Sequence, residues 1–143
     1  CQSSKDSGRV TNPPLRDEIY NISDNRVIRV YEHQNAIMPQ VHIKSKLGTE
    51  YTIDYDNSIA GNVGVTTTND KIYFLYSDTS YSEYSAKDEA KYIKVYNWKG
   101  EHIKDLILPF AVSRIIATDN LLYCIKQDMD RLIVYTFTLD NTI

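Results

Sequence analysis

The stretch Thr68-Asn69-Asp70-Lys71-Ile72-Tyr73-Phe74-Leu75 has two related copies elsewhere in this chain. They are Ser23-Asp24-Asn25-Arg26-Val27-Ile28-Arg29-Val30 and Thr118-Asp119-Asn120-Leu121-Leu122-Tyr123-Cys124-Ile125. Each copy consists of a hydroxyl residue, an Asn/Asp pair and a run rich in residues that favour β-strands. Because Asn and Asp tolerate the left-handed conformations of two-residue hairpin turns, each pair is expected to join two antiparallel strands. The incoming strands are expected at residues 18–22, 63–67 and 112–117.

A second kind of turn follows further along each copy. Alternating strands at 41–44 and 92–96 each lead to a glycine, Gly48 or Gly100, which supplies the positive φ of a turn before the next strand. Residues 132–137 repeat the strand pattern, and the chain stops where a fourth strand would start. The pattern is therefore four strands per unit, twice complete and once cut short. The predicted units span about 18–56, 62–108 and 112–143.

Four antiparallel strands that recur every 40–50 residues are typical of the blades of a β-propeller. A single blade cannot bury its two faces, so neighbouring blades would form the core between them. The composition agrees, because twelve tyrosines stand against three phenylalanines and one tryptophan, and tyrosine favours strands. The predicted fold is all-β, a partial β-propeller of about three blade-like units. A β-sandwich or an irregular β-meander with accidental turn similarity is the alternative.

Two strings carry a family resemblance. Residues 93–104 combine a Val-Tyr pair with an aromatic residue and a glycine turn, and residues 115–123 form a turn, an apolar strand and a tyrosine. This pattern resembles the TolB-like six-bladed β-propeller lipoproteins of Bacteroidetes. The resemblance covers about 60–140 well and 18–56 loosely, so it spans about three blades. It implies a propeller fold, but its motifs are structural and carry little information on function.

The chain begins with Cys1, followed by a polar run, as a mature bacterial lipoprotein does after its signal peptide is removed. Lipid is therefore expected on Cys1, and residues 1–17, which include Pro13-Pro14, are expected to be a flexible tether. The lipid would be the membrane link, since the longest apolar stretch, 106–112, is far shorter than the ~20 residues of a spanning helix. The alternative is that the sequence begins at a cysteine by accident.

Charge and residue spacing argue against several classes of function. The net charge is −3 and the basic residues are scattered, which argues against nucleic-acid binding. The three histidines lack metal-ligand spacing, and no catalytic set, phosphate loop or cofactor motif is found, so no metal and no cofactor are expected. The cluster 54–57 favours a turn over a calcium loop. Cys124 lies in an apolar run and is expected to be buried. The histidines are His33, His42 and His102.

One segment, residues 78–91, interrupts the second unit between its second and third strands and has no hydrophobic period. Its Tyr81, Glu83 and Tyr84 combine aromatic faces with polar groups, which is typical of a recognition surface for a protein or a sugar. The alternative is a solvated loop whose tyrosines lie on their own blade. Trp98 is expected to mark a structural turn that packs between blades and not a sugar site, because the other two units have an apolar residue at its position. Those residues are Leu47 and Phe137.

Three functions are considered. The leading one is a non-enzymatic, lipid-anchored envelope protein that acts as a binding or assembly subunit of an outer-membrane protein complex. The second is a surface lipoprotein that binds glycans through Tyr81 and Tyr84, with Trp98 as a further contact. The third is a propeller-based hydrolase or lyase, because propellers can host such sites. The expected location is the outer membrane, and both the periplasmic face and the cell surface stay open.

Overall fold

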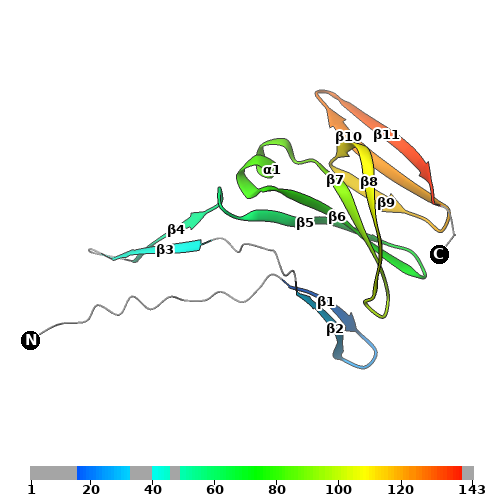
Figure 1. Cartoon of the computed structure of the whole chain (residues 1–143), viewed down its shortest axis with the longest axis horizontal. Helices are drawn as coiled ribbons and strands as arrows, with labels where there is room; N and C mark the ends of the chain where they lie inside the picture. The colour runs from blue at the N-terminus through cyan, green and yellow to red at the C-terminus, as the bar shows by residue number, and fades with distance from the viewer. Residues whose placement is uncertain (1–15, 33–39, 46–48, 140–143) are drawn as a thin grey trace, which may run out of the picture.

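The computed structural model describes residues 16–32, 40–45 and 49–139 (Figure 1). These residues form eleven strands and one helix, as follows. They are β1 (Arg16–Asn21), β2 (Arg26–Glu32), β3 (Gln40–Ser45), β4 (Thr49–Asp54), β5 (Ile59–Thr67), β6 (Lys71–Ser80), α1 (Tyr81–Lys87), β7 (Ala90–Asn97), β8 (His102–Val112), β9 (Arg114–Ala117), β10 (Leu121–Asp128) and β11 (Arg131–Thr138).

All strand pairs are antiparallel, and strands that are neighbours in the chain pair with each other. Strands β5-β6-β7-β8 form one four-stranded sheet, and β9-β10-β11 form a three-stranded sheet. The all-β, propeller-like fold is therefore confirmed. The first unit differs from the expectation, because β1-β2 and β3-β4 are two separate hairpins and β2 does not pair with β3.

The two larger sheets lie against each other (Figure 1). Along β6 and β7, alternate residues point to one face, so Tyr73, Leu75, Ile93 and Val95 are all buried on the side of the three-stranded sheet. That sheet contributes its own alternate residues to the same cluster. They are Ile115, Ala117, Leu122 and Cys124. The core therefore lies between two blade-like sheets, as in a propeller, and Cys124 is buried as predicted.

The turns that open the second and third units are built around threonine and not around a left-handed Asn/Asp pair. The Thr68 hydroxyl accepts a hydrogen bond from the Lys71 N–H at 3.2 Å, and the Thr118 hydroxyl accepts one from the Leu121 N–H at 3.1 Å. The Thr68 N–H also donates to the Lys71 carbonyl at 2.9 Å and the Thr118 N–H to the Leu121 carbonyl at 2.8 Å, so the Asn/Asp pairs form the expected two-residue connections. Their residues do not adopt a positive φ, and the threonine hydroxyl instead satisfies the N–H of the following strand.

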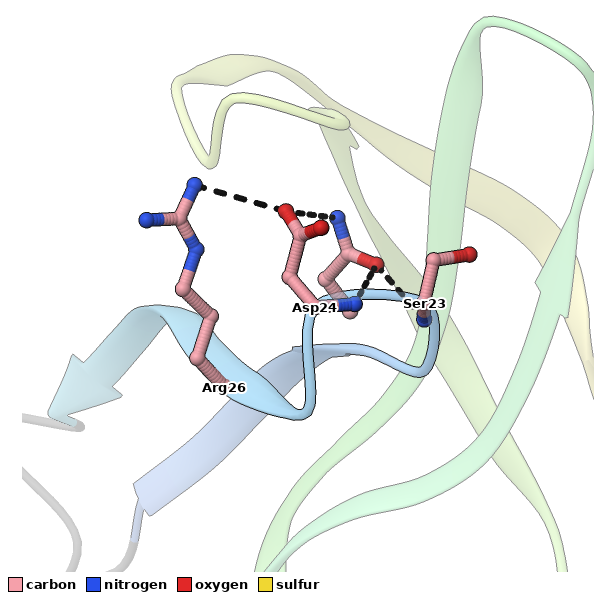
Figure 2. A network of polar contacts seen from close by, with 4 residues as sticks. Ser23, Asp24 and Arg26 are labelled. Atoms are coloured by element: carbon pink, nitrogen blue, oxygen red, sulfur yellow. Dashed lines mark hydrogen bonds and ion pairs between the residues drawn. The ribbon is translucent and has the colours of Figure 1, made fainter.

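The corresponding β1–β2 turn uses an asparagine instead (Figure 2). The Asn21 side-chain oxygen accepts hydrogen bonds from the backbone N–H groups of Ser23, at 2.9 Å, and Asp24, at 3.2 Å. The Asp24 carboxylate in turn lies 3.5 Å from the Arg26 guanidinium. Asn25 has a φ of 50°, so the left-handed conformation predicted from the sequence occurs in this turn.

The segment predicted as an irregular loop, 78–91, contains the helix α1. The Ser80 side chain caps the helix by accepting a hydrogen bond from the Glu83 N–H at 3.2 Å, and the left-handed Asp88 ends it. Glu83 in the first turn and Lys87 in the last turn complement the helix dipole. No residue of α1 is buried, which explains why the sequence shows no hydrophobic period there.

Candidate functional site

A partly enclosed hollow lies beside α1, with a volume of about 190 Å³. Tyr76 on β6 and Tyr92 on β7 are direct cross-strand partners and line it together with Tyr84 from the helix. Glu83 also lines it. The structure therefore brings together two of the three predicted recognition residues, Glu83 and Tyr84. Sequence reasoning missed Tyr76 and Tyr92, although their strand positions were expected.

The hydroxyl of Tyr84 is held by the end of its own helix. It donates a hydrogen bond of 2.8 Å to the Asp88 carboxylate. Burial raises the pKa of Tyr84 to about 12, and the hydrogen bond and the charge of Asp88 add to the effect. At neutral pH this side chain is therefore a neutral phenol that is already partnered, and it is not a general base.

The other two rings of this hollow have lysines of the same chain beside them. The Lys94 ammonium lies 3.9 Å from the centroid of the Tyr76 ring, and the Lys91 ammonium lies 5.2 Å from that of Tyr92. Burial raises the pKa of Tyr76, and the charge of Asp78 raises it further. Internal cations therefore already occupy part of the aromatic surface that a ligand would need.

Tyr81, the third predicted recognition residue, lies apart from this hollow. Its ring packs against Tyr55, with ring centroids 5.1 Å apart and a tilt of 30°. Both tyrosines keep a large part of their surface exposed. Tyr81 therefore contacts Tyr55 and does not line the hollow, although residues three positions apart share one face of a helix and Tyr81 also contributes to the raised pKa of Tyr84.

Trp98 lies in the β7–β8 turn and is 43% exposed, so the expectation that it packs between blades is wrong. Its indole N–H donates a hydrogen bond of 3.3 Å to the Thr68 carbonyl of the β5–β6 turn. Phe137, which the sequence pattern aligned with Trp98, is half-buried and contacts Phe110, with ring centroids 6.2 Å apart. Phe137 lies within β11 opposite Leu122, so it takes the register position of Tyr96, whereas Trp98 lies beyond the end of β7.

Trp98 also lines a second, more open hollow where three turns meet. The residues that line it are Thr67, Thr68, Asn69, Trp98, Ala117, Thr118 and Asp119. Asn69 and Asp119 take the same position in their two turns, one residue after the threonine. The sequence of one unit does not indicate that Asn69 and Asp119 line the same hollow. The alignment of the repeats shows only that they take equivalent positions.

The outer face of the three-stranded sheet carries an exposed apolar surface. Ile116 on β9, Leu132 on β11 and Val134 on β11 are 51%, 68% and 57% exposed. The registers of β9, β10 and β11 place them on one side of the sheet, together with Tyr123 and Ile125. The face opposite to them is the one buried in the core.

Several further predictions concern titratable residues. In the described part of the chain, no group of three or more metal-ligating side chains is found. His102 pairs with the Asp105 carboxylate at 2.8 Å, and both side chains are exposed. Burial raises the pKa of Cys124 to about 11, so its thiol stays protonated at neutral pH. Cys1, His33 and Leu47 lie outside the described residues.

Comparison with known proteins identifies the family. A family model described as TolB-like 6-blade propeller-like matches residues 10–120, which include β1 to β9. No curated protein and no solved structure matches the chain. Among the described residues, no helix is long and apolar enough to span a membrane. The chain belongs to the TolB-like 6-blade propeller-like family.

Proposed function

We propose that this protein is a non-enzymatic, lipid-anchored binding protein that assembles with another protein of the bacterial outer membrane. Membership of a TolB-like propeller family supports a protein-binding role. The lipid anchor, the bacterial outer membrane and the absence of catalysis are parts of the proposal. They rest on Cys1 with the polar run that follows it, on the resemblance to lipoproteins and on the kind of surface that the chain presents.

The observation that carries the proposal is the outer face of the three-stranded sheet. In the repeat, Ile125 takes the position of Leu75, and Ile125 pairs with Val134 as Leu75 pairs with Ile93. Val134 on this face is therefore equivalent to Ile93, which is fully buried between the two sheets. Tyr123 on the same face is likewise equivalent to the buried Tyr73. The outer face therefore has the chemistry of a surface that another β-sheet covers. In this proposal the partner protein covers the face with a sheet of similar apolar character, and a further blade of a longer chain is the alternative occupant.

The edge of the same sheet supports this assignment. Within the described residues β11 pairs only with β10, so its second edge has backbone groups available for pairing. Unpaired strand edges recruit strands of other proteins, and main-chain hydrogen bonds then add to the burial of the apolar face. A partner that covers both the face and the edge would therefore bind more tightly than one that covers the face alone.

Site-specific photo-crosslinking tests the proposal in intact membranes. A photoreactive residue at Val134 is expected to give one dominant adduct with a membrane protein, because this position lies in the centre of the outer face. The same residue at Lys87, on the exposed side of α1, is the matched control. Absence of a Val134 adduct, or the same adducts from both positions, would refute the assembly role.

A charge substitution gives an independent test of the same face. Val134→Lys is expected to abolish co-purification of the partner with little change in stability, because the side chain is already more than half exposed. Ile22→Lys, at an exposed turn position, should leave co-purification intact. If Val134→Lys leaves the partner bound, the outer face is not the binding surface.

The lipid anchor is tested separately by mass spectrometry of the native protein. A diacyl or triacyl adduct on Cys1 is expected, because more than one acyl chain is needed for stable anchoring. Cys1→Ser should then release the protein from membranes, whereas Cys124→Ser should leave it bound. A plain thiol at Cys1 would refute the anchor while leaving the binding face to be judged by the crosslinking result.

A further inference from the structure

The hollow beside Trp98 is formed by three turns that are fixed to each other. The Ala117 N–H donates a hydrogen bond of 2.9 Å to the Thr66 hydroxyl, which joins the β9–β10 hairpin to the β5–β6 hairpin. The Trp98 indole N–H joins the β7–β8 turn to the Thr68 carbonyl. The walls of the hollow therefore keep a constant spacing without a ligand, which lowers the entropy cost of binding.

Each of the three turns is also rigid by itself. The hydroxyls of Thr68 and Thr118 accept backbone hydrogen bonds within their own turns. In the third turn the Asn97 side-chain oxygen accepts a hydrogen bond of 2.9 Å from the Glu101 N–H. Gly100 there adopts a φ of 85°, which suits glycine. The two threonine hydroxyls are thus used for structure and leave the neighbouring side chains to face the hollow.

Those neighbouring side chains are Asn69 and Asp119. Both are exposed, and neither side chain has a hydrogen bond within the described part of the chain. The charge of Asp119 contributes, after burial, to raising the pKa of Tyr73, so the carboxylate lies near that ring. An amide offers both donors and an acceptor, and a carboxylate offers acceptors only. Together they match a ligand with several adjacent hydroxyl groups.

We propose that this hollow is a carbohydrate-binding site, in which the exposed part of the Trp98 ring stacks on the C–H face of a pyranose while Asn69 and Asp119 bind its hydroxyls. A sugar ring has one apolar face and a polar edge, which corresponds to one aromatic platform with planar polar groups beside it. An organic cation is the less suitable ligand, because cation sites use several aromatic rings and this hollow has one. The site is distinct from the protein-binding face and does not depend on the proposed function.

The chain contains a single tryptophan, so intrinsic fluorescence reports directly on this site. The full chain is titrated with neutral oligosaccharides, namely maltotriose, cellotriose, xylotriose and tri-N-acetylchitotriose, with choline as the cation control. At least one oligosaccharide is expected to shift the Trp98 emission to shorter wavelength in a saturable way and to protect the ring from iodide quenching. Choline is expected to do neither.

Substitutions that keep the reporter separate binding from structure. Asp119→Ala is expected to weaken the affinity roughly tenfold, since a hydrogen bond to a charged group contributes about 1.5–3 kcal/mol and 1.4 kcal/mol is tenfold. Asn69→Ala should weaken it less, and Asp130→Ala, in the exposed β10–β11 turn, should leave it unchanged. Circular dichroism of each variant controls for folding.

Three results would overturn the site. The first is that none of the four oligosaccharides changes the fluorescence. The second is a response that persists unchanged in the Asn69→Ala/Asp119→Ala double variant, which would show that the sugar contacts the protein elsewhere. The third is an equal response to choline, which would assign the hollow to cations. Saturation-transfer NMR of Trp98→Phe measures sugar binding without tryptophan fluorescence. The phenylalanine ring should still stack on the sugar, so a weaker saturation-transfer signal from the sugar is expected.

Discussion

The second and third units present equivalent faces to different surroundings. On the second unit, Tyr73, Leu75 and Ile93 are buried against the next sheet. On the third unit the equivalent residues are Tyr123, Ile125 and Val134, of which the first two are half-buried and the third is exposed. The residue types are nearly the same, so the repeat specifies a face to be covered, while the neighbour decides whether it is covered.

This comparison separates two kinds of information. The first kind is the alternation of apolar and polar residues along a strand, which determines which residues share a face. The register of β6 with β7, and of β10 with β11, places these apolar residues opposite each other. Burial depends on a second sheet, which no single unit contains. A residue can therefore have a core identity and still be exposed, and such a residue marks a surface for association.

The largest effect is expected from one substitution made at both equivalent positions. Ile93→Ala, in the buried cluster, should lower the free energy of unfolding by about 2–5 kcal/mol, because it leaves a cavity. Val134→Ala, at the equivalent position on the outer face, should change it by no more than about 0.5 kcal/mol, because this side chain is more than half exposed. Denaturant unfolding of the purified chain measures both. Equal losses would mean that the outer face is already covered in solution.

A smaller effect is expected where the two sheets are joined by a polar contact. Thr66→Val removes the acceptor of the Ala117 N–H and leaves this donor buried, which should cost about 1–3 kcal/mol. Thr66→Ser keeps the hydroxyl and should retain most of the stability. Chemical denaturation would show the difference. Faster hydrogen exchange of the Ala117 amide in Thr66→Val alone would locate the effect at the junction between the sheets.

The sequence predicted the strands of the second and third units well, because their turns contain threonine, asparagine and glycine at regular places. The predicted incoming strand of the third unit began at residue 112, whereas Val112 is the last residue of β8 and β9 begins at Arg114. The prediction missed this boundary because the break at Ser113 contains no strong turn residue. The helix α1 was missed because its stabilisation is local, by the Ser80 cap and the Asp88 end, with no buried stripe to give a period.

The candidate sites were predicted only in part, for a related reason. Glu83 and Tyr84 share a hollow as expected, but their neighbours Tyr76 and Tyr92 come from strands that pair across the sheet. The Trp98 hollow combines residues from three turns, and Asn69 and Asp119 are far apart in the chain. Local patterns indicate which residues lie in turns, whereas the contact between turns depends on the packing of one sheet against another.

The contrast between Trp98 and Phe137 gives a third test. Trp98→Ala should lower the free energy of unfolding by only about 1 kcal/mol, the value of one hydrogen bond and a partly exposed ring. Phe137→Ala should cost more, since its ring packs against Phe110 inside the partly buried layer. Thermal unfolding measures both variants. A larger loss for Trp98→Ala would restore a structural role for this residue and would weaken the case for a ligand there.

The smallest effect concerns α1, which the second unit has and the third unit replaces by a short turn at Met129 and Asp130. The neutral Tyr84 hydroxyl donates to Asp88, and the pKa of Tyr84 is raised from its ordinary value of 10.0 to about 12. A raised pKa in the folded state means that this contribution is complete below pH 10 and is lost as the pH rises towards about 12.

The difference in stability between the natural chain and Tyr84→Phe isolates this contribution, because the other buried tyrosines and Cys124 are common to both. At neutral pH the natural chain should be the more stable by a few tenths of a kcal/mol, since the hydrogen bond is largely exposed to solvent. Above the raised pKa the natural chain should become the less stable of the two, because an ionised Tyr84 is partly buried beside the Asp88 carboxylate. Hydrogen exchange should then show the loss in α1 while β10 and β11 stay protected. A difference that persists unchanged at high pH would mean that Tyr84 stabilises the helix by packing of its ring and not by its bond to Asp88.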